Sequence, residues 1–280
     1  MKIKLKDGSE KTYQQSMSIY DIALDISEGL ARMACVGIVD GEIKDLRTVI
    51  DRDCELNIAT ARDPEGLRAL RHTASHVMAE AVMKVRPEAK VAIGPAIENG
   101  FYYDFETEPF SREDLDEIEK EMKKLIKQGE RLNYTTLPRQ EAIELMEKRQ
   151  EPYKVELIQD LPKDSVISFY EQGGFMDLCA GPHLMNTKPI KAFKLISSSG
   201  AYWRGSEKNK MLTRIYGTAF GTKDELEAYL EYLENIKKRD HNKVGREMEI
   251  FTTVDVIGQG LPLLMPKGAK MLQTLQRWIE

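Results

Sequence analysis

Three of the four histidines in this 280-residue chain fall into two short motifs whose residue types can bind a metal or hold a water. The first motif is His72 and His76, and the second is Cys179 and His183, about a hundred residues later. Imidazole and thiolate groups are ligands of tetrahedral zinc. The same groups can accept a proton from a water molecule and orient it. The two motifs therefore indicate a hydrolytic site or a metal site, and they leave that choice open.

A helix over residues 63–85 is expected to position the first pair. Asp63 is a favourable N-cap residue, and the helix should end before Pro87. A spacing of four places His72 and His76 on one face of the helix, opposite its apolar stripe. That face is poor in charge, which indicates that another part of the protein covers it. A structural role for the pair, as core or exposed polar side chains, remains an alternative.

The second motif is expected at the end of a strand. Residues 175–179 have strand character, and within them Asp177 and Cys179 face the same side, where the carboxylate could orient an imidazole. The Gly181-Pro182 turn can then bring His183 back toward Cys179. A structural zinc site is the other interpretation of these ligands. Structural ligand pairs usually lie on turns of small domains, however, whereas one pair here lies within a helix.

Four segments are expected to make up the chain, and the predicted fold class is α+β. Residues 1–61 follow the order of a β-grasp (ubiquitin-like) sheet with one helix, capped by Ser18 and running through Leu30, and we recognise no chemistry in them. Residues 62–221 mix helices and strands without a βαβ rhythm, which predicts an α+β domain with an antiparallel sheet. Within them, Ser111 and Asp114 form a capping-box pattern at the start of a helix that should end near Gly129. Residues 222–245 have the periodicity of a connector helix with a charged outer face. Residues 246–280 begin a further element, with a helix expected from Ala269 onward.

The composition favours a soluble protein of a reducing compartment. The chain is 41% hydrophobic and 31% charged, and its apolar runs are far shorter than the ~20 residues that a membrane span needs. The N-terminus also lacks the apolar stretch of a signal peptide. Three cysteines in a chain of this length argue against a disulfide framework. We therefore expect a cytoplasmic protein that makes no membrane contact.

Any nucleic-acid binding must be local, because the formal net charge of the chain is −5. Seven of the eight charged residues from Lys188 to Arg214 are basic, and Tyr202 and Trp203 lie among them. Basic groups neutralise phosphates, and aromatic rings stack on unpaired bases. We call residues 188–214 the basic strip. A solvated surface around two core aromatic side chains explains its composition at least as well.

The motifs resemble the editing module that threonyl- and alanyl-tRNA synthetases share, known as the second additional domain. The surrounding sequence is closer to the threonyl branch. Residues 1–61 are similar to the TGS domain that precedes this module, and residues 248–268 resemble the beginning of a class II aminoacylation domain. The further segments that carry the resemblance are Gly94-Pro95, Asn99-Gly100-Phe101-Tyr102-Tyr103-Asp104, Tyr153-Lys154-Val155, Asp177 to His183, and Gly200-Ala201-Tyr202-Trp203-Arg204-Gly205.

The resemblance implies an editing site, and its residues fall into two groups. The catalytic group is His72, His76, Asp177, Cys179, His183 and Lys154. The substrate-binding group is Tyr103, Trp203 and Arg204. In alanyl relatives the His/His/Cys/His set binds zinc, whereas in threonyl enzymes it positions a water without an obligatory metal. Editing by this chain should therefore require no cofactor, with zinc at His72, His76, Cys179 and His183 as the alternative.

Editing is needed because serine differs from threonine by one methyl group, which is worth only ~1–3 kcal/mol of discrimination. The expected reaction is hydrolysis of Ser-tRNA(Thr), with the acceptor end of tRNA(Thr) and its seryl-adenosine moiety as partners. ATP, the threonine-selecting zinc and a homodimer interface would belong to the class II domain, of which only the beginning is present. The stop at Glu280, inside a helix, favours a fragment. A free-standing alanyl-type editor and a non-catalytic RNA-binding regulatory module are the alternatives.

Overall fold

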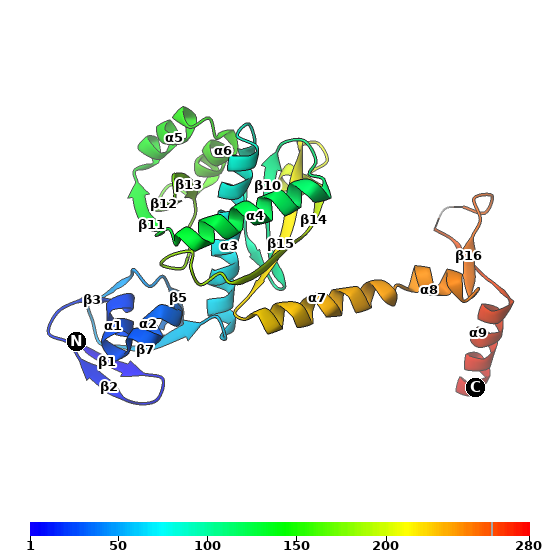
Figure 1. The fold of residues 1–280 in the computed structure, drawn as a ribbon, viewed down its shortest axis with the longest axis horizontal. Coiled ribbons are helices and arrows are strands. Elements are labelled where there is room, and N and C mark those ends of the chain that lie inside the picture. Colours follow the sequence, from blue (N-terminus) through cyan, green and yellow to red (C-terminus); the bar gives the residue numbers. More distant parts are fainter. Residues whose placement is uncertain (259) are drawn as a thin grey trace. The chain divides into compact units, whose positions relative to one another are not determined.

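The computed structural model describes residues 1–258 and 260–280 (Figure 1). It divides into two compact units, Met1–Leu226 and Glu227–Glu280. Gln259 belongs to the segment that resembles the beginning of a class II domain, and it lies outside the described residues. Within the described part of the chain, no helix combines the length and the apolar character that crossing a bilayer requires.

The first unit begins with a β-grasp sheet, as the sequence predicted. Its strand order is β2-β1-β7-β4-β5; β1 and β7 are parallel, and the other neighbours are antiparallel. Asp7-Gly8 and Asp40-Gly41 form the turns of its two hairpins. The elements of this module are β1 (Lys2–Leu5), β2 (Glu10–Thr12), β3 (Met17–Ser18), α1 (Ile19–Ile26), α2 (Glu28–Met33), β4 (Ala34–Val39), β5 (Glu42–Lys44), β6 (Val49–Ile50) and β7 (Cys54–Thr60).

The helix expected in this module is interrupted. Ser18 caps α1 by accepting a hydrogen bond from the N–H of Asp21, as expected. Ser27 then adopts an extended conformation (φ −170°, ψ 135°), and its hydroxyl accepts from the N–H groups of Gly29 and Leu30. One serine therefore ends α1 and caps α2, because a short hydroxyl side chain competes with the helical backbone for hydrogen bonds.

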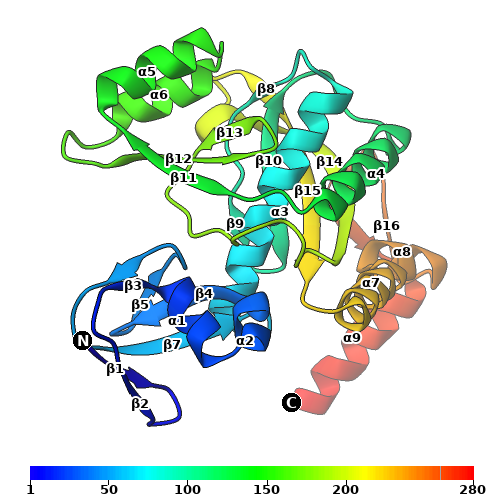
Figure 2. The same cartoon turned by 60° about the vertical axis from the view of Figure 1, so that its left-hand side comes forward.

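Helix α3 (Pro64–Val85) is the central element of the first unit (Figure 2). It ends before Pro87, as predicted, and it contacts β10, β15 and α4 as well as β4 and β7 of the β-grasp sheet. Asp63 is the N-cap residue, as predicted, but its side chain does not cap the helix, because its carboxylate accepts from the N–H of Thr60 at 2.8 Å. From residue 69 to 82 every side chain except that of His72 is buried. The histidine face is therefore covered by protein, as its low charge indicated.

An antiparallel sheet lies against α3, with the strand order β14-β15-β10-β8 and with β9 paired to β10. Helix α4 packs against both α3 and β14. The predicted capping box at Ser111 and Asp114 is present, and Gly129 ends α4 in the left-handed conformation (φ 71°). These elements are β8 (Lys90–Val91), β9 (Ala96–Ile97), β10 (Gly100–Glu106), α4 (Arg112–Gln128), β14 (Ala192–Tyr202) and β15 (Met211–Phe220).

A smaller layer carries the second motif. It comprises an antiparallel sheet in the order β11-β12-β13 and two helices that share an apolar core with it. Strand β13 ends at Leu178, so Cys179 and His183 lie in the irregular segment that follows. The elements are β11 (Asn133–Leu137), α5 (Arg139–Lys148), α6 (Pro152–Asp160), β12 (Ile167–Gln172) and β13 (Phe175–Leu178). The α+β fold class with antiparallel sheets is confirmed.

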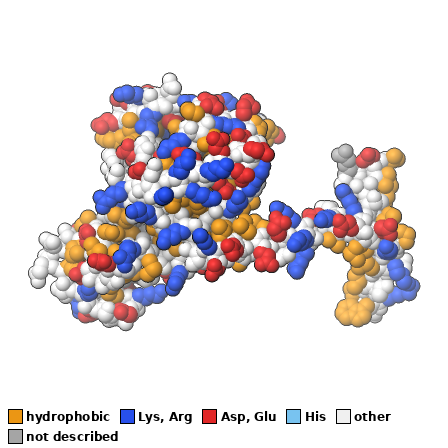
Figure 3. Space-filling model, viewed as in Figure 1, with side chains coloured by type: hydrophobic (Ala, Val, Ile, Leu, Met, Phe, Trp, Pro, Cys, Tyr) orange, Lys and Arg blue, Asp and Glu red, His pale blue; other side chains and the backbone are white. Residues whose placement is uncertain are grey.

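The connector helix expected over residues 222–245 is two helices. Asp240 leaves the helical conformation and caps α8 through its carboxylate, which accepts from the N–H of Lys243. The last helix begins at Pro266 rather than Ala269, since proline is favoured in the first turn. The second unit exposes many hydrophobic side chains (Figure 3). The last elements are α7 (Lys223–Lys238), α8 (His241–Glu247), β16 (Phe251–Thr253), β17 (Pro262–Leu264) and α9 (Pro266–Ile279).

Candidate functional site

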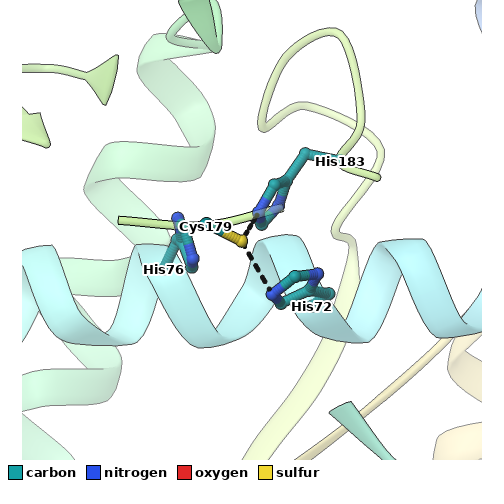
Figure 4. Close-up of side chains that lie close together, drawn as sticks. All are labelled: His72, His76, Cys179 and His183. Atoms are coloured by element: carbon teal, nitrogen blue, oxygen red, sulfur yellow. Dashed lines mark hydrogen bonds between the residues drawn. The ribbon is translucent and has the colours of Figure 1, made fainter. Parts of the chain in front are cut away.

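Four of the predicted site residues form one cluster. Helix α3 supplies His72 and His76, and the segment after β13 supplies Cys179 and His183 (Figure 4). One ligand atom from each residue lies within 4.8 Å of the other three. Cys179 Sγ lies 3.3 Å from His72 Nε2 and 3.2 Å from His183 Nε2. The turn at Gly181-Pro182 therefore returns His183 to Cys179, as the spacing predicted.

Burial keeps the cluster uncharged at neutral pH. Burial lowers the pKa of His72 to about 4, and it lowers the pKa of His76 to about 3 although Asp177 opposes the shift. Burial also lowers the pKa of His183 well below its ordinary value and raises the pKa of the Cys179 thiol to about 12. At pH 7 the cluster therefore holds three neutral imidazoles, which can accept protons, and one protonated thiol.

Thr73 sets the tautomer of His183. The Thr73 hydroxyl donates to the carbonyl of Ala69 at 2.9 Å and accepts from the N–H of Leu184 at 3.0 Å. Its oxygen also lies 3.1 Å from His183 Nδ1. Because the single hydroxyl hydrogen is used on Ala69, we assign the ring proton to Nδ1, which donates to Thr73. The lone pair on His183 Nε2 is then directed at Cys179 Sγ.

Asp177 connects the cluster to a buried cation. Asp177 Oδ1 pairs with Lys154, and the side chains of both residues are only 3% exposed. Asp177 Oδ2 accepts from the Tyr103 hydroxyl at 2.5 Å and lies 3.3 Å from His76 Nε2. Burial acts to raise the pKa of Asp177, but Lys154, His76 and Tyr103 together hold it below its ordinary value. Asp177 is therefore ionised, and it can orient the His76 ring as a hydrogen-bond acceptor.

The donor set fits a zinc ion. Imidazole and thiolate are both zinc ligands, and the four side chains supply the number of ligands that a tetrahedral site needs. In addition, His76 Nδ1 is buried and has no hydrogen-bond partner among the described residues. A buried nitrogen lone pair of this kind is costly unless a metal ion, a water or a substrate group meets it.

A cavity of about 240 Å³ opens beside His72. Of the four cluster residues, only His72 lines it. His76 and His183 lie deeper and are 2% and 0% exposed. The cavity wall consists of Ile43, Glu65, Arg68, Ala69, His72, Pro95, Ala96, Gly181 and Pro182.

The remaining predicted residues lie apart from the cluster or behind it. Tyr103 is fully buried, and Lys154 is bonded to its hydroxyl at 3.0 Å. Trp203 is 5% exposed, and its Nε1 donates to Glu156 of α6. Arg204 forms ion pairs with Glu156 and Asp160, also of α6. The contacts of Trp203 and Arg204 are thus made with α6, whereas the cluster is formed by α3 and residues 179–183.

The basic strip carries less unbalanced charge than its composition suggests. Four of its seven basic side chains form ion pairs with acids from other elements. These four are Lys194 with Glu119, Arg204 with Glu156 and Asp160, Lys210 with Glu106, and Arg214 with Asp104. The electrostatic argument for a nucleic-acid surface over residues 188–214 is correspondingly weaker.

Four residues that touch the cluster or its supports were not predicted from the sequence: Thr73, Asp45, Tyr170 and Arg47. Thr73 was noticeable only as a polar residue within the buried part of α3. Asp45 accepts from the His183 N–H and from the Tyr170 hydroxyl, and Arg47 donates to carbonyls beside His183. Asp45 is separated from His183 by 138 positions, so no local pattern indicates this contact.

Two family models match the chain. Residues 1–60 match the TGS domain. Residues 167–216 match the "Threonyl and Alanyl tRNA synthetase second additional domain". The second match includes Asp177, Cys179 and His183, but it does not extend to the histidines of α3.

Curated relatives cover the whole chain, and each is named threonine--tRNA ligase. The protein of Clostridium perfringens (strain ATCC 13124) is 61% identical and is matched over 100% of this chain and 43% of its own length. The Acetivibrio thermocellus protein is 56% identical over 99% of this chain and 44% of its own length. The Clostridioides difficile protein is 50% identical over 100% of this chain and 44% of its own length. The chain thus spans less than half the length of these relatives, and it matches the N-terminal region of threonine–tRNA ligases, as a TGS domain followed by a second additional domain.

Proposed function

We propose that this chain hydrolyses the ester bond of Ser-tRNA(Thr) and so removes serine that has been wrongly attached to threonine tRNA. The observation that carries the proposal is the cluster of His72, His76, Cys179 and His183 beside a cavity of about 240 Å³. Neutral imidazoles that converge on one point are suited to holding and deprotonating a water. The similarity to threonine–tRNA ligases, which extends over the whole length of this chain, supports the choice of substrate.

The cavity beside His72 is proposed to receive the seryl group. A synthetic site that selects threonine rejects serine by only ~1–3 kcal/mol, so a second and smaller site is needed. Small and rigid residues, Ala69, Ala96 and the Gly181-Pro182 turn, line this cavity. We propose that they admit the serine hydroxymethyl group and exclude the additional methyl group of threonine.

The proposed reaction begins with a water held at His72. Its oxygen attacks the ester carbonyl carbon while the neutral imidazole takes one of its protons. The bond from the carbonyl carbon to the ribose oxygen then breaks, and the proton returns to that oxygen. Asp177 stabilises the positive charge that develops on His72, because its carboxylate favours the protonated form of that imidazole. Since Lys154 and Tyr103 are buried behind Asp177, we propose that they hold the carboxylate and do not contact the substrate.

Zinc would be held by His72, His76, Cys179 and His183, where it would lower the pKa of the thiol and polarise a water.

We also propose that the editing domain spans residues 62–221, which is wider than the family match, because α3 supplies two of the four cluster residues. The acceptor end of tRNA(Thr) is the proposed partner, in the cytoplasm. ATP-dependent charging with threonine and dimerisation would need the part of the relatives that this chain does not span.

The test is release of serine from Ser-tRNA(Thr) by the 280-residue chain, with Thr-tRNA(Thr) and Ser-tRNA(Ala) as comparison substrates. The proposal predicts hydrolysis of Ser-tRNA(Thr), loss of that activity in His72→Ala and Cys179→Ala, and full activity in His241→Ala. His241 is the fourth histidine and lies exposed in α8, so it is the matched control.

Three results would contradict the proposal in different ways. Unchanged rates in His72→Ala and Cys179→Ala would show that the site is wrong. Binding of tRNA without release of serine would favour a regulatory RNA-binding module. Tight stoichiometric zinc together with a preference for Ser-tRNA(Ala) would favour an alanyl-type editor.

A further inference from the structure

A segment of the β-grasp module reaches the back of the cluster. Asp45 and Arg47 follow β5, and their side chains are only 14% and 18% exposed. Asp45 Oδ1 accepts from both the backbone N–H and the guanidinium of Arg47, each at 2.9 Å. Asp45 Oδ2 accepts from the Tyr170 hydroxyl at 2.9 Å, from Arg47 Nη1 at 3.1 Å and from the backbone N–H of His183 at 3.2 Å.

Arg47 holds the same stretch of chain from a second direction. Its Nη2 donates to the carbonyl of Leu184 at 3.0 Å and also to the carbonyl of Leu132. The Tyr170 ring, whose hydroxyl is bonded to Asp45, lies 4.5 Å from the His183 ring between centroids. The Asp45–Arg47 pair is therefore bonded to the N–H of His183 and to the carbonyl of the next residue.

His183 needs such external supports, because residues 179–184 belong to neither a helix nor a strand. The N–H of Cys179 donates to the carbonyl of Ser168 at 3.0 Å, whereas the described residues 180–184 have no backbone partner of this kind and depend on side-chain contacts. Thr73 fixes the His183 ring, and the Asp45–Arg47 pair fixes the backbone. A cavity of about 280 Å³, lined by Asp45, Tyr170 and Pro182 among others, leaves the segment space to move when these bonds are lost.

We propose that Asp45, held in place by Arg47, is a positioning residue for His183, so that the β-grasp module helps to set the geometry of the hydrolytic site. The proposal rests on the proposed function, because it assigns Asp45 a part in that reaction. Groups that orient a catalytic or metal-binding side chain typically change activity by about 10- to 100-fold when they are replaced. A carboxylate that served only to join two parts of the chain would need no bond to the backbone of a cluster residue.

The test is Asp45→Asn in the whole 280-residue chain. An asparagine keeps the size of the side chain, but its NH₂ group must face donors on one side, either those of Arg47 or those of Tyr170 and His183. We expect kcat for Ser-tRNA(Thr) hydrolysis to fall about 10- to 100-fold with a much smaller change in KM, because Asp45 is bonded to His183 and does not itself line the cavity beside His72. The ring ¹⁵N resonances of His183 should shift, since its backbone anchor is lost.

Asp40→Asn is the matched control. Asp40 belongs to the same β-grasp module, and its carboxylate accepts from the Glu55 N–H and pairs with Arg52 of that module. We expect it to leave both kcat and the His183 resonances at their wild-type values. If Asp45→Asn does not fold, Tyr170→Phe removes one donor to the same carboxylate, and a smaller shift of the His183 resonances is expected.

Wild-type kcat and unmoved His183 resonances in Asp45→Asn would overturn the proposal. The same holds if Asp45→Asn and Asp40→Asn lose activity equally while the His183 resonances stay in place, because the role would then be structural. Unmoved resonances in Tyr170→Phe would overturn it where Asp45→Asn is unfolded. If the wild-type chain does not hydrolyse Ser-tRNA(Thr), the proposed function fails, whereas the His183 resonances of Asp45→Asn still decide whether Asp45 positions that ring.

Discussion

Removal of the Lys154 charge is the sharpest test of the buried ion pair behind His76. In Lys154→Met the apolar part of the side chain is retained, but Asp177 loses the cation that contacts Oδ1. The donors left to Asp177 are the Tyr103 hydroxyl at 2.5 Å and His76 Nε2 at 3.3 Å. Asp177 would still be only 3% exposed, so water could not replace the ammonium group.

The size of the effect follows from burial. Removing one partner of a buried ion pair costs about 3–5 kcal/mol, because the other charge is left uncompensated. We expect the lower end, about 3 kcal/mol, since Tyr103 still donates a charge-assisted hydrogen bond. At roughly 2–4 °C per kcal/mol for a unit of this size, Tm should fall by about 6–12 °C. The pKa of His76 should rise, because Lys154 now helps to lower it.

Thermal and urea unfolding of the wild type, Lys154→Met, Asp177→Asn and the double variant would measure this effect. The double variant should be destabilised by less than the sum of the two single variants, because the two residues interact directly. Lys148→Met, at an exposed position of α5, is the control and should unfold like the wild type. If Lys154→Met unfolds at the same temperature as Lys148→Met, the argument from a buried and uncompensated Asp177 is refuted.

Three further predictions concern the supports of the site. Thr73→Val should lower the deacylation kcat about tenfold, because it removes the acceptor of the His183 Nδ1–H; Thr135→Val, at an exposed position of β11, should not. Gly94→Ala should lower both the unfolding midpoint and the deacylation rate, because its Cβ would lie 1.9 Å from Tyr103 Cδ2; wild-type rates would show that the Tyr103–Asp177 bond is dispensable. The folded pKa of His76, about 3, lies below the ordinary value of about 6.5, so the unfolded chain binds this proton first and stability falls as pH drops from 6.5 toward 3. At pH 5 the free energy of unfolding is about 2 kcal/mol lower for this reason. The free energy of unfolding of His76→Asn should therefore depend less steeply on pH than that of the wild type. Equal slopes for the two proteins would contradict this prediction.

The sequence predicted those elements whose ends carry local signals. Pro87, the capping box at Ser111 and the left-handed Gly129 are such signals, and α3 and α4 end or begin where these residues require. The two interrupted helices were missed. Ser27 and Asp240 lie within apolar periodicity that continues past them, and the side chain of each instead caps a new helix. Periodicity reports which face is apolar, and it does not report whether a cap competes with the helix.

The cluster itself could be predicted, because its parts are local: a four-residue spacing on one helix and a turn between Cys179 and His183. Its supports could not be predicted in the same way. Asp45 contacts His183 from a separate sheet, and Thr73 acts through a buried hydroxyl that resembles any core threonine. Composition also overstated the basic strip, because acids from other elements neutralise Arg204 and three of its neighbours in the strip.

The low pKa of His72 suits the charge of the proposed substrate. The α-amino group of an aminoacyl ester is a cation over part of the physiological pH range, with an ordinary pKa near 8. An imidazolium at the cavity would repel that cation, whereas a neutral imidazole does not, and the pKa of about 4 keeps His72 neutral. Glu65 and Arg68 line the same cavity, and they offer a carboxylate for the ammonium group and a guanidinium for an adjoining phosphate. The charges of Asp177 and Lys154 are thus paired with each other in the interior, and His72 presents an uncharged proton acceptor where the ester would lie.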